Sequence, residues 1–148
     1  MVRMIMDNVD GYMNYQMIGG EPLMMENWAE IAEAVTSVEN VRFCIYTNAS
    51  MTDRMAPLLE RRLDPAKVCV AMAMHPNQRG FNADEFLRTA VALRCHGYGL
   101  VIIAVDLPIN EPWLSENEKI FEDLGLPVSR YQDVRSSNPG FNIQGVLP

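Results

Sequence analysis

The sequence predicts an α/β protein in which strands and helices alternate, with a parallel sheet of about five strands. Residues 67–76, KVCVAMAMHP, and residues 100–108, LVIIAVDLP, are nearly continuous apolar runs, which are typical of parallel strands buried on both faces. Segments whose apolar residues recur at helical spacing alternate with such strand-like runs along the chain, as βαβ units require. Right-handed crossovers then give either an open doubly wound sheet or a barrel segment, and both bind ligands at the carboxyl ends of the strands.

The first half of the chain is predicted to contain two strands, each followed by a helix. Residues 15–19 form the first strand, and the helix over residues 24–38 has one apolar stripe. Residues 41–48, VRFCIYTN, form the second strand. The next helix covers residues 52–62, and Pro57 is expected to delay its start or to bend it.

The third strand, residues 67–76, has two different faces. The larger side chains on one face are Val68, Val70, Met72 and Met74. Because helices cover apolar strand faces in α/β proteins, this face is expected to meet helices, and the face with smaller residues is expected to look toward a crowded region. A helix over residues 82–99 follows, with Asn82 as its N-cap and Glu85 completing a capping box.

The remaining elements are a strand at 100–108, a helix at 113–124 that ends at Gly125, and a strand at 127–134. Residues 1–135 are therefore predicted to form one domain. Residues 136–148 are rich in turn-forming residues, so an irregular tail is expected there.

The composition excludes several classes of function. The 148 residues carry a net charge of -7, which argues against binding a nucleic-acid backbone because such binding needs a basic face. No apolar run is long enough to span a membrane, and the N-terminus lacks the features of a secretory signal. Motifs of hydrolases and phosphate-binding loops do not occur.

The cysteines argue for a reducing compartment. Cys44, Cys69 and Cys95 lie far apart in apolar contexts, where buried free thiols are expected. Their spacing matches no zinc or iron–sulfur motif. We therefore expect a cytoplasmic protein.

Polar residues follow every apolar strand, at the edge where α/β proteins bind ligands. These segments are GGEP (19–22), YTNAS (46–50), MHPNQ (74–78), VDLPIN (105–110) and YQDVR (131–135). Glycine lets the backbone turn sharply or approach a ligand closely, and proline suits a first helical turn. Glu21 has two interpretations, a partner for a cation or an acid in a first helical turn. His75 is either an acid–base residue or ligand, or a structural histidine.

The stretch MIGGEPLMMENWAEIAEAV, followed by a strand ending in YTNAS and a strand ending in HP, resembles radical S-adenosylmethionine (radical SAM) enzymes. The resemblance runs from about Ile18 to Leu107 in the order of the strands. It implies a partial TIM-like (β/α) barrel in which GGEP lies close to the amino group of the cofactor's methionine part. One strand of the family ends in a TNG-like motif. Thr47, Asn48 and Ala49 match this motif, with alanine in place of glycine.

This resemblance also implies which residues bind the cofactor. The set is Gly19, Gly20, Glu21, Pro22, Thr47, Asn48, His75 and Asn77. The GGEP residues would line the methionine end of S-adenosylmethionine, with Thr47 and Asn48 on the same rim. His75 and Asn77 lie where the family often contacts the ribose.

One departure affects the expected chemistry. The family holds a [4Fe–4S] cluster on a CxxxCxxC loop, and the three cysteines here do not have that spacing. The resemblance would place the first strand and the cluster ligands before Met1, so we expect a fragment or a cluster-free relative that is inactive by itself. The alternatives are an inactive binding or interaction module and an unrelated doubly wound protein. The first strand would have an uncovered edge, so self-association or a partner is expected there.

Overall fold

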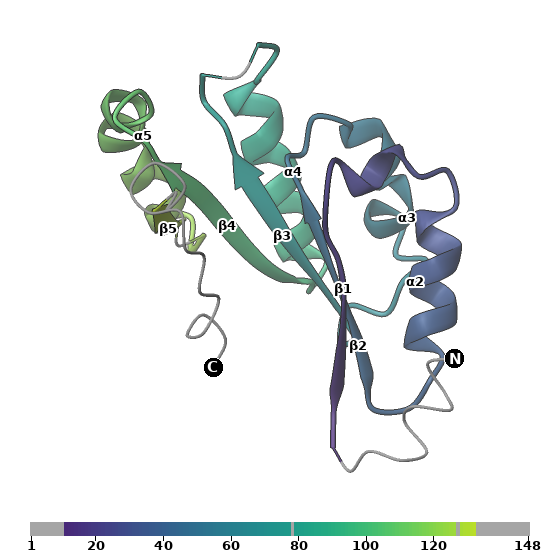
Figure 1. Ribbon diagram of the computed structural model, residues 1–148. Helices are drawn as coiled ribbons and strands as arrows, with labels where there is room; N and C mark the ends of the chain where they lie inside the picture. The colour runs from purple at the N-terminus through teal and green to yellow at the C-terminus, as the bar shows by residue number, and fades with distance from the viewer. Residues whose placement is uncertain (1–10, 78, 127, 133–148) are drawn as a thin grey trace.

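The computed structural model describes residues 11–77, 79–126 and 128–132. Strands and helices alternate along this part of the chain, as predicted (Figure 1). The strands are β1 (Met13–Met17), β2 (Val41–Thr47), β3 (Val68–Met74), β4 (Gly99–Asp106) and β5 (Val128–Gln132). The helices are α2 (Trp28–Thr36), α3 (Ala56–Leu59), α4 (Ala83–Cys95) and α5 (Glu111–Asp123), with short 3-10 helices η1 (Pro22–Met24) and η2 (Thr52–Met55).

The five strands form one parallel sheet in the order β1-β2-β3-β4-β5. Each strand therefore pairs with the next one along the chain. A doubly wound sheet needs a point at which the strand order reverses, and the described residues have none. The doubly wound alternative is therefore wrong, and the partial (β/α) architecture is confirmed. Figure 1 shows α2, α3 and α4 on the same side of the sheet.

The core lies between the helices and one face of the sheet. Val68 is 3% exposed, and Val70, Met72 and Met74 are each 0% exposed, so the prediction for the large face of β3 is confirmed. Phe86 of α4 and Phe121 of α5 belong to the same core.

The other face of the sheet is open in the described part of the chain. It borders a hollow of about 480 Å³ that is lined mainly by alternate residues of β1 to β4. The expectation that the face with smaller residues looks toward a crowded region is therefore wrong for these residues, and Val101 of β4 is 39% exposed there. An apolar strand pattern does not distinguish a helix-covered face from the inner face of a barrel segment, because both suit apolar residues.

Local chemistry explains some of the element boundaries. Asn82 Oδ1 accepts a hydrogen bond from Glu85 N at 3.2 Å, which confirms the predicted N-cap of α4. The carboxylate of Glu85 instead accepts from Thr52 Oγ1, so only half of the capping box forms. Pro57 lies in the first turn of α3, and the predicted helix at 52–62 is divided into η2 and α3.

Helix α2 begins at Trp28, later than predicted, because η1 occupies the start of the segment. Residues 1–10 and the tail at 136–148 lie outside the described residues, as does the predicted domain boundary at residue 135. Within the described residues, no helix has the length and apolar character needed to cross a membrane.

Candidate functional site

Glu21 joins the loop after β1 to the end of β2. Its Oε1 accepts hydrogen bonds from Thr47 Oγ1 at 2.7 Å and from Leu23 N at 3.1 Å. Its Oε2 accepts from Asn48 N at 2.8 Å. The carboxylate therefore caps η1 and holds two strand ends together, which supports the interpretation of Glu21 as an acid at a helix start. The structure brings Glu21, Thr47 and Asn48 together, as the candidate set requires.

The end of β2 is held by further local hydrogen bonds. Thr47 Oγ1 accepts from Ala49 N at 3.0 Å, and Asn48 Oδ1 accepts from Ser50 N at 2.9 Å. Ala49 has a φ of +54°, in the left-handed region that glycine adopts most easily. The TNG-like motif that this segment resembles has glycine at the position of Ala49, and the left-handed conformation gives a physical reason for that glycine.

Gly19 and Gly20 provide an open stretch of backbone at the carboxyl edge of the sheet. Their φ angles are +105° and +55°, and a Cβ added to either would meet no atom within 4 Å. In the part of the chain that the structure describes, neither residue takes part in a backbone hydrogen bond. Pro22 is buried at the start of η1. The peptide groups of both glycines are therefore accessible to a ligand, while Glu21 and Pro22 fix the loop that carries them.

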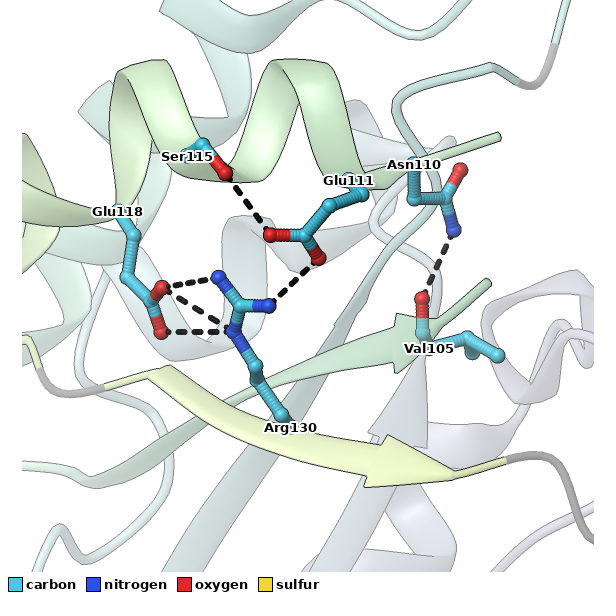
Figure 2. A network of polar contacts seen from close by, with 6 residues as sticks. All are labelled: Val105, Asn110, Glu111, Ser115, Glu118 and Arg130. Atoms are coloured by element: carbon cyan, nitrogen blue, oxygen red, sulfur yellow. Dashed lines mark hydrogen bonds and ion pairs between the residues drawn. The ribbon is translucent and has the colours of Figure 1, made fainter. Parts of the chain in front are cut away.

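Asn77 connects the loops that follow β3 and β4. Its Nδ2 donates to Ile109 O at 2.6 Å and to Asn110 Oδ1 at 2.8 Å. Asn110 is 4% exposed and donates from Nδ2 to Val105 O at 2.9 Å (Figure 2). Sequence reasoning placed Asn110 in a polar segment at this edge, VDLPIN, but did not single it out as a site residue. No described hydrogen bond joins Asn77 to Glu21.

His75 follows β3 directly and is half-buried. Burial lowers its pKa below the ordinary value of 6.5, so the imidazole is neutral at pH 7. A neutral imidazole can both donate and accept a hydrogen bond. The side chain is therefore chemically suited to a polar ligand at this edge.

Arg130 anchors β5 to α5 beside this edge. Figure 2 shows its guanidinium between the carboxylates of Glu111 and Glu118. Arg130 Nη1 lies 2.7 Å from Glu111 Oε2, and Nη2 lies 2.6 Å from Glu118 Oε2. Ser115 Oγ donates to Glu111 at 2.8 Å, and this bond together with Arg130 lowers the pKa of Glu111. The groups are partly exposed, so they position β5 rather than supply much stability.

The cysteines do not fit an iron–sulfur cluster. Such a cluster needs several thiolates around one point. In the described residues no group of three or more His, Cys, Asp or Glu side chains could hold a metal ion. Cys44 and Cys69 are half-buried on neighbouring strands, whereas Cys95 ends α4 and is exposed. The expectation of buried thiols is therefore wrong for Cys95, because the last turn of α4 presents it to solvent.

Comparisons with known proteins support the fold. No family model matches the chain, and no curated protein matches it. Solved structures of anSMEcpe, an anaerobic sulfatase-maturating radical SAM enzyme, are similar to it. Hexahistidine-tagged anSMEcpe with bound AdoMet aligns at a TM-score of 0.64 and 15% identity, over 89% of this chain and 39% of that one.

Native anSMEcpe with bound AdoMet and Cp18Cys peptide gives a TM-score of 0.64 at 15% identity, over 89% of this chain and 41% of that one. The complex of native anSMEcpe with bound AdoMet and Kp18Cys peptide gives a TM-score of 0.65 at 14% identity, over 88% of this chain and 40% of that one. The chain thus spans about two fifths of the length of these structures. At this level of identity the likeness is one of fold. The chain is therefore similar in its α/β fold to part of these AdoMet-bound structures.

Proposed function

We propose that this chain is a radical-SAM-like scaffold that binds S-adenosylmethionine at the carboxyl edge of its sheet, without cluster ligands of its own. The observation that carries the proposal is the open Gly19-Gly20 backbone, fixed in place by the carboxylate of Glu21. The GGEP resemblance and the shared fold with AdoMet-bound structures support it.

The chemistry of this edge suits the methionine part of the cofactor. An ammonium group needs hydrogen-bond acceptors, and the carbonyl groups of Gly19 and Gly20 have no backbone partner among the described residues. Thr47 and Asn48 act indirectly in this proposal, because their polar groups hold Glu21 and the turn at Ala49. Neutral His75 is proposed to contact the ribose, with Asn77 keeping the adjacent loop in place.

The missing cluster ligands limit the proposed activity. Since the three cysteines do not gather at one point, we assign this chain no cleavage of the cofactor by itself. The proposal therefore covers a fragment of a radical SAM enzyme and a cluster-free relative alike, and cofactor binding is the property common to both.

Isothermal titration of S-adenosylmethionine into the iron-free protein tests the proposal. We expect one cofactor to bind per chain, and Gly20→Val to raise Kd by at least about tenfold because its side chain would occupy the ligand's space. Gly125→Val is the matched control. Gly125 also has a positive φ, +70°, and open space around it. It differs in place, because it lies just before β5 and therefore at the amino end of that strand.

Both variants carry a similar backbone strain, so a difference between them isolates the site. Equal affinities for Gly20→Val and Gly125→Val would contradict the assignment of the glycine loop. A folded wild-type chain that binds no S-adenosylmethionine would contradict the proposed function and favour an interaction module.

We also propose that the edge of β1 that is unpaired within the described residues pairs with a partner or a second copy. Within the described residues β1 is bonded only to β2, and exposed strand edges template further pairing. Tyr12, directly before β1 in the sequence, is 70% exposed, and Ile18, directly after it, is 61% exposed. Size-exclusion chromatography with light scattering should show a species larger than a monomer, and Ile18→Lys should reduce it. A monodisperse wild-type monomer would argue against this edge as an interface between copies of the chain.

A further inference from the structure

Cys44 and Cys69 lie side by side on the open face of the sheet. They are direct partners in the parallel pairing of β2 with β3, so their side chains leave the sheet on the same face. Both thiols are free and half-buried, and both line the hollow of about 480 Å³. Because neighbouring strands are about 4.8 Å apart, one ion can reach both sulfur atoms.

Gly99 leaves Cys69 uncovered on the side of β4. It is the direct partner of Cys69, and a Cβ added to Gly99 would lie 3.6 Å from Cys69 Sγ. The sulfur thus leans against a position that has no side chain. Gln16 is the partner of Cys44 on the other side, so the two thiols occupy the middle of a row across four strands.

Metal ions bind thiolates rather than thiols, so an ion held by both sulfur atoms would displace their protons and neutralise the two negative charges in this half-buried place.

We propose that Cys44 and Cys69 form a two-thiolate site for a single soft metal ion of the Cu(I) or Zn²⁺ class. Thiolate ligands select such ions over hard cations. Since the described residues offer no third ligating side chain at one point, the ion would complete its coordination with water or a small ligand in the hollow. The site lies toward the amino ends of β3 and β4, whereas the glycine loop follows the carboxyl end of β1, so it is independent of the proposed cofactor binding.

Titration of the reduced full-length protein with Cd²⁺ alone, under anaerobic conditions, tests this inference. The thiolate-to-cadmium charge-transfer absorption should saturate at one ion per chain with the intensity of two thiolates. Cys44→Ser and Cys69→Ser should each weaken binding by about 100-fold or more, since loss of an outer-shell partner alone costs up to about 100-fold. Cys95→Ser removes the exposed thiol and keeps the pair, so it should bind like the wild type.

A further variant separates the site from a folding defect. Gly99→Val keeps both thiols but places a side chain against Cys69 Sγ, so it should weaken Cd²⁺ binding and slow the alkylation of Cys69. Circular dichroism checks that each variant is folded. Wild-type affinity in folded Cys44→Ser or Cys69→Ser would overturn the inference, as would loss of the absorption in Cys95→Ser or its absence from the wild type. If the serine variants do not fold, unchanged binding in Gly99→Val would overturn it.

Discussion

Replacing Glu21 with alanine is expected to lower the free energy of unfolding by about 2–4 kcal/mol, because three donors lose their acceptor. Thr47 is 2% exposed, so its hydroxyl cannot easily turn to water instead. The same substitution should abolish binding of S-adenosylmethionine at the proposed site, since the glycine loop would no longer be tied to β2. Urea unfolding followed by circular dichroism measures the first effect, and calorimetric titration measures the second.

Glu26→Ala is the control for this prediction. Glu26 lies in the segment between η1 and α2 and is exposed, so its removal should change stability by less than about 0.5 kcal/mol. Glu21→Gln keeps one carbonyl oxygen but places an amide donor near Asn48 N, so an intermediate loss is expected. Equal stabilities for Glu21→Ala and Glu26→Ala would show that the carboxylate does not hold the loop.

Phe121→Ala should destabilise the protein by about 3–5 kcal/mol, the usual cost of emptying an aromatic core position. Phe121 is 2% exposed, and its ring packs against Phe86 at a centroid distance of 6.2 Å and against Trp113 at 6.4 Å. These rings attach α5 to the core beside α4, so the last βα unit depends on them. Chemical denaturation gives the loss in free energy, and near-ultraviolet circular dichroism reports the loosened aromatic packing.

The adjacent residue of the same helix supplies the control. Ile120 is 47% exposed, so Ile120→Ala removes a similar apolar group without opening a core cavity. A loss below about 1 kcal/mol is expected for it. If the two variants were equally destabilised, the aromatic cluster would not be what attaches α5.

Much of the fold was predictable because its signals are local. Apolar runs such as residues 67–76 identify parallel strands, and Asn82 and Gly97 mark the two ends of α4 through backbone preferences that act within one helical turn. Alternation along β3 also identified its buried face correctly. Such patterns do not contain the strand order, so the choice between a barrel segment and a doubly wound sheet depended on a resemblance.

The candidate site was predictable as a set of segments and only partly as a set of contacts. The motif placed Gly19, Glu21, Thr47 and Asn48 at one edge, and the structure joins the last three by hydrogen bonds. The motif did not show that the carboxylate of Glu21 accepts hydrogen bonds from other residues of the chain. Nor did it show that Asn77 is held by Asn110, because these partners are distant along the sequence.

The sequence by itself determined the alternation of strands and helices, the polar carboxyl edge and the open glycines of the first loop. Only the tertiary structure decided the strand order, the pairing of Cys44 with Cys69, and which face of the sheet the described residues leave open. The physical reason is the range of the interactions. Helical caps, turns and apolar periodicity act over a few neighbouring residues, whereas register and side-chain contacts depend on how distant segments pack together.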